Sequence, residues 1–114
     1  MKIYLLGTKG EMSQVVVPDS NFSSGTCLQS RIDCTYSELV KAFGEPTHKG
    51  DGYKTDAEWD ILTPFGVCTV YNYKDGQNYN GANGLAVEDI TDWHLGGFDK
   101  RSAEAVVARI RSTN

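Results

Sequence analysis

The stretch that decides the fold reads TYSELVKAFGEP over residues 35–46 and, after a glycine-rich segment, AEWDILTPFGVCTVYNY over residues 57–73. Thr35 can cap the first free amides of a helix, and Glu38, three positions later, can reach back to the N–H group of the cap. Gly44 can adopt the left-handed conformation that ends a helix, and the proline two positions later forbids its continuation. We therefore predict a helix that begins after the cap and ends at the glycine.

The second half of this stretch has the pattern of a β-hairpin. Trp59 and Ile61 alternate with Glu58 and Asp60, which is the period-two pattern of a half-buried strand and sends the two carboxylates to the solvent side. Residues 67–73 are rich in β-branched and aromatic side chains and predict the return strand. The helix and the hairpin are expected to share one core, to which these residues contribute: Leu39, Phe43, Trp59, Ile61 and Val67.

The remaining elements are read from shorter patterns. Residues 2–6 and 11–17 predict two strands that pair as an N-terminal hairpin, and residues 26–33 predict a third strand. Residues 74–88 form a long irregular segment with three turn dipeptides, of a kind that is often functional. Residues 89–95 predict the last strand, with either a bulge or burial on both faces near Asp92, and two consecutive glycines end it.

The last helix begins near Asp99 or Ser102, and its buried stripe includes Val106 and Ile110. The order of elements is therefore β-β-β-α-β-β-β-α. Because short turns favour antiparallel pairing, the predicted class is α+β, with a twisted antiparallel sheet of five to six strands and two helices packed on one face. At 114 residues, the chain 1–114 is expected to form a single domain.

Composition narrows the classes of function. The chain has 15 acidic and 11 basic residues, and the net charge of −4 argues against a protein that neutralises nucleic-acid phosphates. The three cysteines do not form a C-x-x-C pair and are interpreted as small buried residues rather than as disulfides or metal ligands. The apolar run at residues 3–6 is too short for a signal peptide, and no run is long enough for a membrane span, so the expected compartment is the cytoplasm.

Two resemblances add to this interpretation. The helix that ends in Gly-x-Pro, followed by a strand that carries Trp59, is similar to the half-repeat of the β-lactamase-inhibitor-like and outer-membrane-assembly lipoprotein fold. Members of that fold bind other proteins. The lipoprotein's signal sequence and lipid-anchor cysteine do not occur here, so that particular function is not expected.

The broader resemblance covers residues 34–97. The motifs FGEPT (43–47), GDGYKTDAEW (50–59), YNYKDG (71–76) and EDITDWHLGG (88–97) resemble a family of small bacteriophage-encoded proteins. This resemblance implies a phage protein that acts in the cytoplasm of the bacterial host. Small phage proteins of this type often counter host defences, either by blocking a nuclease complex or by sequestering a nucleotide signal.

The sequence offers little for catalysis. It contains no H-x-x-x-H motif, no G-x-S-x-G motif and no phosphate-binding loop, and no metal or cofactor is expected. The remaining enzymatic alternative is a small hydrolase or nuclease that uses His94 with Asp92 or Glu88. The acidic residues between 51 and 60 lack the spacing of a calcium loop and are interpreted as a solvated face.

Binding of a ligand or a partner protein is the better supported expectation. The segments 45–56 and 74–88 leave neighbouring strands of the hairpin and should meet at the same end of the sheet. Tyrosines among asparagines and glycines suit a binding surface, and lysines attract a phosphate or an acidic partner. Solvated loops whose tyrosines merely cover the sheet end are the alternative. The candidate ligand- or partner-binding residues are His48, Lys49, Tyr53, Lys54, Lys74, Asn78, Tyr79, Trp93 and His94.

We therefore expect a non-enzymatic phage protein that counters a bacterial defence system. Its partner would be a small nucleotide ligand or a host defence protein such as a CRISPR effector, and a pocket for the nucleotide would be expected at the interface of a homodimer. A phage accessory protein without a defence role is a further alternative.

Overall fold

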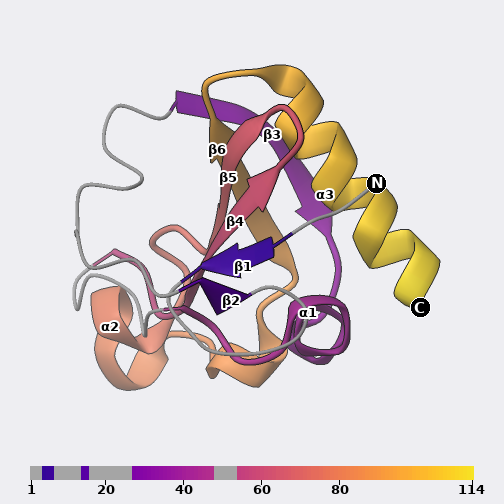
Figure 1. Ribbon diagram of the computed structural model, residues 1–114. Helices are drawn as coiled ribbons and strands as arrows, with labels where there is room; N and C mark the ends of the chain where they lie inside the picture. Colours follow the sequence, from indigo (N-terminus) through magenta and orange to yellow (C-terminus); the bar gives the residue numbers. More distant parts are fainter. Residues whose placement is uncertain (1–3, 7–13, 16–26, 48–53) are drawn as a thin grey trace.

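The computed structural model describes residues 4–6, 14–15, 27–47 and 54–114 (Figure 1). The protein is α+β, with helices α1 and α3 packed on one face of a sheet. The strands are β1 (Tyr4–Leu6), β2 (Gln14–Val15), β3 (Cys27–Asp33), β4 (Glu58–Thr63), β5 (Gly66–Tyr71) and β6 (Asp92–Gly97). The α-helices are α1 (Tyr36–Phe43), α2 (Gln77–Asn80) and α3 (Lys100–Thr113), and the two 3-10 turns are η1 (Gly81–Asn83) and η2 (Val87–Asp89).

The strands lie in the order β2-β1-β4-β5-β6-β3. The longer strands β3, β4, β5 and β6 form the antiparallel body of the sheet, and β1 is antiparallel to β4. β1 and β2 pair in parallel, so the predicted N-terminal hairpin is wrong. The α+β class with an antiparallel sheet is confirmed. The number of five to six antiparallel strands is not confirmed, and the count of two helices is wrong because α2 is a third.

Helix α1 begins and ends where the sequence predicts. The Thr35 hydroxyl accepts a hydrogen bond of 3.1 Å from the Glu38 N–H, and the Glu38 carboxylate accepts one of 2.8 Å from the Thr35 N–H. This reciprocal pair satisfies two amides that the first turn of a helix leaves free. Gly44 closes the helix with a φ of 83°, and its N–H donates to the Val40 carbonyl.

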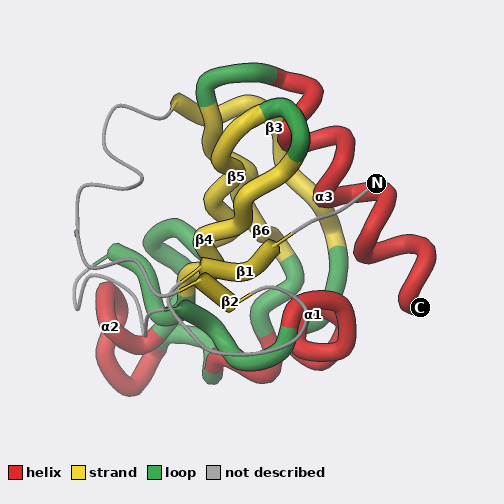
Figure 2. Tube along the Cα trace, in the orientation of Figure 1, coloured by secondary structure: helices red, strands yellow, loops and turns green. Residues whose placement is uncertain are grey.

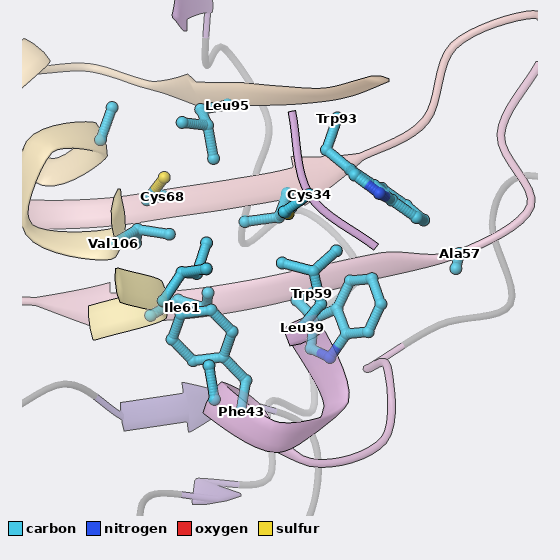
Figure 3. Packing of buried hydrophobic residues seen from close by; sticks show 14 of the residues in the cluster. Cys34, Leu39, Phe43, Ala57, Trp59, Ile61, Cys68, Trp93, Leu95 and Val106 are labelled. Atoms are coloured by element: carbon cyan, nitrogen blue, oxygen red, sulfur yellow. The ribbon is translucent and has the colours of Figure 1, made fainter. Parts of the chain in front are cut away.

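The core lies between the sheet and the two helices α1 and α3 (Figure 3). Trp59 and Trp93 are completely buried, and their rings meet edge to face at 5.5 Å, an arrangement that aromatic pairs prefer. The Trp59 indole N–H donates to the Gly44 carbonyl at 2.9 Å, which ties the end of α1 to the sheet. Of the predicted core residues, Val67 is buried but lies outside the main cluster, because the pleat turns it to the other face of the sheet.

The glycines at the end of β6 do not interrupt the strand, contrary to the prediction. A Cβ on Gly96 would lie 2.7 Å from the Thr69 hydroxyl oxygen, and one on Gly97 would lie 2.7 Å from the Ser102 hydroxyl oxygen. The missing side chains therefore allow close packing inside the sheet and against α3. Of the two alternatives expected near Asp92, the described pairs do not contain the bulge, because the register shift lies in β3, between Leu28 and Ser30.

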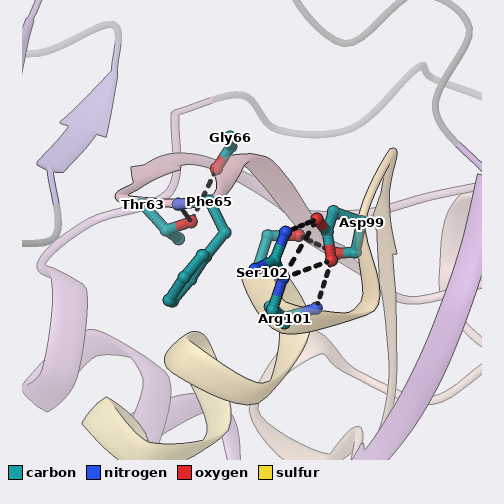
Figure 4. A network of polar contacts seen from close by, with 6 residues as sticks. All are labelled: Thr63, Phe65, Gly66, Asp99, Arg101 and Ser102. Atoms are coloured by element: carbon teal, nitrogen blue, oxygen red, sulfur yellow. Dashed lines mark hydrogen bonds and ion pairs between the residues drawn. The ribbon is translucent and has the colours of Figure 1, made fainter.

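Helix α3 is anchored at its start to the β4–β5 turn (Figure 4). The Asp99 carboxylate accepts a hydrogen bond of 2.9 Å from the Arg101 N–H and forms an ion pair with the Arg101 guanidinium. The guanidinium lies 5.0 Å from the centre of the Phe65 ring, which is a cation–π contact. This contact connects the helix to the tip of the hairpin.

Candidate functional site

The two segments that the sequence expects to meet do so over their described residues. The Lys74 N–H donates to the Lys54 carbonyl at 2.7 Å, and the Asn78 N–H donates to the Asp56 carboxylate at 3.1 Å. This convergence of residues 54–56 with residues 74–78 confirms the predicted geometry. The candidates His48, Lys49 and Tyr53 lie outside the described residues.

A buried asparagine joins the two segments. Asn72 has no exposed surface, and its side-chain oxygen accepts hydrogen bonds from the N–H groups of Asp56 and Ala57 at 2.7 and 3.2 Å. Its side-chain nitrogen donates to the carboxylates of Asp56 and Asp75 at 2.8 and 3.0 Å. A buried amide with this many partners fixes the relative position of the two segments.

The segment after β5 contains short helices, so the prediction of an irregular segment over residues 74–88 is wrong. It contains α2, η1 and η2, and Figure 2 shows α2 on the side of the molecule away from α3. The Leu85 N–H donates to the Asp75 carbonyl at 3.0 Å, which closes the segment on itself. A Cβ on Gly76 would overlap the Asp56 carboxylate, so a larger residue here would have to displace this side chain from its hydrogen bond with Asn72.

Lys74 occupies the most unusual backbone position of this site. Its φ is 62°, and it is the one described residue other than glycine with a positive φ. Its N–H is bound by the Lys54 carbonyl, and its own carbonyl accepts a hydrogen bond of 2.9 Å from the Asn80 side chain. Such a conformation persists where its surroundings hold it, and it is frequent at functional sites.

The Lys74 ammonium group lies between two tyrosine rings. Its nitrogen is 5.2 Å from the centre of the Tyr73 ring and 5.4 Å from the centre of the Tyr79 ring. Both tyrosines are exposed, at 41% and 39% of their surface. The left-handed backbone thus presents a positive charge between two accessible aromatic faces.

His94 extends this arrangement onto the sheet. Its ring centre lies 5.5 Å from that of Tyr71 and 5.6 Å from that of Tyr73, on the face of the sheet opposite α1 and α3. Burial is the main cause that lowers the pKa of His94, and the Asp92 carboxylate opposes it. Burial also raises the pKa of Tyr71. We call the set Tyr71, Tyr73, Lys74, Tyr79 and His94 the aromatic–lysine cluster.

The sequence identified three members of this cluster, Lys74, Tyr79 and His94, and missed Tyr71 and Tyr73. Both tyrosines could have been found, because they share one parity along the chain and His94 is opposite Tyr71 in the register. Lys54 and Asn78 help to join the two segments through backbone and side-chain bonds.

The inclusion of Trp93 in the candidate site is wrong. Its side chain has no exposed surface, and its indole N–H donates to the Ile90 carbonyl at 3.2 Å. Residues next to each other on a strand point to opposite faces, so Trp93 faces the core when His94 faces outward. The solvent assignment of Asp60 is also wrong, because this residue is only 3% exposed.

A second concave surface lies beside the start of α2. It is a groove of about 710 Å³ between the end of α1 and the segment 77–88. Its walls include the carboxylates of Glu45, Asp56 and Glu88 together with the ring of Tyr36. Burial, Glu45 and Glu88 all raise the pKa of the Tyr36 hydroxyl. The charge of this groove is opposite to that of Lys74.

The described residues give few means for metal or nucleophilic chemistry. They contain no group of three or more His, Cys, Asp or Glu side chains that could hold a metal ion. Cys34 and Cys68 are buried, and burial is the main cause that raises the pKa of each thiol to about 12. Cys27 is exposed, so the interpretation of all three cysteines as buried residues is wrong for this one.

One of the proposed acid partners of His94, Asp92, is bound by another side chain. The Asp92 carboxylate is bound by the Arg31 guanidinium through two hydrogen bonds of 3.0 and 2.5 Å. The described contacts contain no hydrogen bond between His94 and either Asp92 or Glu88.

Comparisons of the chain with protein-family models, with curated proteins and with solved structures found no match. Among the described residues, no helix has both the length and the apolar character that crossing a membrane would require.

Proposed function

We propose that this protein is a non-enzymatic binding protein of phage origin, and that it counters a bacterial defence system by sequestering a nucleotide-type signal in the host cytoplasm. The observation that carries the proposal is the position of the Lys74 ammonium group between the rings of Tyr73 and Tyr79. A nucleotide combines a flat base with a phosphate, and this site offers aromatic faces beside a cation. The resemblance of the motifs to small phage proteins supplies the biological setting.

The energetic argument rests on stacking and charge. Stacking of a base on an aromatic side chain contributes about 1–3 kcal/mol, and a phosphate beside the lysine adds an attraction that falls with salt. Lys74 costs little to order on binding, because its backbone is already fixed by the Lys54 carbonyl and the Asn80 side chain. A preorganised cation between two rings is therefore a suitable receptor for a base and its phosphate.

Calorimetric titration with a panel of cyclic mononucleotides, dinucleotides and trinucleotides tests this function. We expect one member to bind, and we expect Lys74→Ala to weaken that binding at least about tenfold, or about 1.4 kcal/mol. Lys41→Ala, which removes an exposed lysine from the last turn of α1, is the matched control and should bind as the wild type does. If no nucleotide of the panel bound, the proposal that the protein sequesters a nucleotide signal would be contradicted.

A second candidate function, the blocking of a defence protein such as a CRISPR effector, is favoured by the acidic groove. Nuclease components present basic surfaces to nucleic acid, and the groove with Glu45, Asp56 and Glu88 has the complementary charge. Charge reversal at Glu45 and Glu88 should then abolish inhibition of the effector and leave nucleotide binding unchanged.

Plating separates a defence role from a phage accessory role. Phage with and without the gene would be compared on hosts that carry and lack the defence system. The proposal predicts an effect on the defended host alone, and equal effects on both hosts would support the accessory alternative. The hydrolase alternative would be supported instead if His94→Gln abolished the effect of the gene on the defended host while the variant protein still bound the nucleotide.

A further inference from the structure

The outer edge of β3 is exposed along most of the strand. β3 has seven residues and is the last strand in the sheet order, and none of the described residues pairs with its outer side. A sheet edge presents unpaired N–H and C=O groups, which can bind another strand. Leu28 near its start is 54% exposed, and the strand's charged residues Arg31 and Asp33 are exposed as well.

The hydrogen-bond pattern shows which residues face outward. The Cys34 N–H donates to the Thr91 carbonyl at 3.1 Å, toward the chain that leads into β6. Because backbone groups alternate along an antiparallel strand, those of Ile32 also face β6, and those of Arg31 and Asp33 face away from the sheet. The outward backbone groups therefore belong to two residues of opposite charge.

We propose that β3 pairs in antiparallel fashion with β3 of a second copy of this chain, with the two-fold axis at Ile32. In this register Arg31 lies opposite Asp33 of the second copy, and each pair combines backbone hydrogen bonds with opposite charges. A shift of the register by two residues in either direction would place Arg31 opposite Arg31, or Asp33 opposite Asp33. Like charges directly opposite each other are destabilising. The sequence of this edge is thus self-complementary in one register.

The surroundings of the edge leave room for a second strand. A groove of about 530 Å³ runs beside β3, and Val107 and Arg111 of α3 form part of its wall. Ile32 also lines this groove and would meet the same residue of the second copy at the axis. The Asp92 bonds occupy the Arg31 donors at Nε and one terminal nitrogen, so the other terminal nitrogen can reach the Asp33 carboxylate across the interface.

The dimer would carry both aromatic–lysine clusters on one continuous sheet face. His94 lies opposite Arg31 in the register, one strand in from the edge. The two His94 residues would then lie three strand spacings apart across the sheet, roughly 14 Å at about 4.8 Å each, and would be offset by two residues along the strands. The dimer would form whether or not the cluster binds a nucleotide.

Light scattering on a sizing column, across a concentration series of the full chain, tests the pairing. We expect wild-type protein at twice the mass of one chain. Asp33→Arg alone and Arg31→Glu alone should each run as monomers, because each places like charges opposite across the axis. An equimolar mixture of the two variants should recover the dimer. In that mixed pair the arginine introduced in one variant faces the glutamate introduced in the other, and the retained Arg31 faces the retained Asp33.

Asp89→Arg, which makes the same charge reversal at an exposed residue outside β3, is the matched control and should remain dimeric. Circular dichroism of each variant would verify that it is folded. Wild-type protein that remains monomeric at every concentration would overturn the proposal. So would single variants that remain dimeric, because the interface would then lie elsewhere, or a folded mixture that fails to dimerise.

Discussion

The side-chain nitrogen of Asn72 donates a hydrogen bond of 2.8 Å to the Asp56 carboxylate, and this contact links the end of the hairpin to the loop that precedes it. The oxygen of the Asn72 side chain accepts hydrogen bonds from the N–H groups of Asp56 and Ala57. The relative position of Lys74 and its neighbours therefore depends on one fully buried polar residue.

Replacement of this residue should be costly. We predict that Asn72→Ala lowers the free energy of unfolding by about 3 kcal/mol, because it leaves buried donors and acceptors without partners. Asn78→Ala is the control, since it removes one side-chain bond at an exposed residue and should cost about 1 kcal/mol or less. Urea denaturation measures both, and equal losses would contradict the central position of Asn72.

The left-handed backbone at Lys74 predicts a difference between two variants that both lack the ammonium group. Lys74→Gly should be more stable than Lys74→Ala by about 0.5–1 kcal/mol, because only glycine adopts a φ of 62° without steric cost. Urea denaturation of the pair gives this difference. An alanine variant at least as stable as the glycine variant would show that the position is not strained.

His94 predicts a dependence of stability on pH. Burial lowers its pKa in the folded protein, whereas the unfolded chain takes up the proton near the ordinary value of 6.5. The unfolded state therefore binds more protons below that value, so the free energy of unfolding should fall as the pH drops from 7 through 6.5 and level off below the folded pKa. Asp92, whose pKa is lowered mainly by the Arg31 hydrogen bond, contributes only as the pH falls through its ordinary value of 3.8 and below.

Urea midpoints between about pH 7 and about pH 5 would measure the His94 contribution. The rise of the urea midpoint with pH should be absent from His94→Gln. It should be retained in His48→Gln, which changes the other histidine of the sequence. A slope that survives in His94→Gln, or that disappears from His48→Gln instead, would assign the effect to a different group.

The cysteines predict an order of thiol reactivity. Cys27 should react with a thiol reagent in the folded protein, because it is exposed. Cys34 and Cys68 should react only after unfolding, because burial raises each pKa to about 12 and also excludes the reagent. Mass spectrometry of the alkylated protein would count the labels, and rapid modification of Cys34 or Cys68 in the folded state would contradict the packing.

Local signals predicted a large part of this fold. The capping box at Thr35 and the stop at Gly44 are each encoded within a few residues, and the structure contains both. The pattern around Trp59 predicted a strand with Trp59 and Ile61 in the core, which the structure also contains, although Asp60 is buried as well. The convergence of the two segments also followed from hairpin geometry. These features depend on interactions between residues that are close in the sequence, so sequence patterns predict them.

The errors concern features that depend on distant contacts. Nothing near Gly96 and Gly97 tells that Thr69 and Ser102 will approach them, so a strand was expected to end where it continues. The regular structure of the segment after β5 depends on Asn72 and Asp56, which lie outside this segment. Trp93 neighbours His94 in the sequence, but the pleat separates the two side chains and Trp93 is buried in the core.

The most direct measurement of the central claim is amide chemical-shift mapping of isotope-labelled protein during titration with each cyclic nucleotide of the panel. The account predicts that at least one nucleotide shifts the amides of Tyr73, Lys74, Tyr79 and His94, and that Lys74→Ala weakens the response. Shifts confined to other parts of the chain, or no shift with any nucleotide, would contradict it.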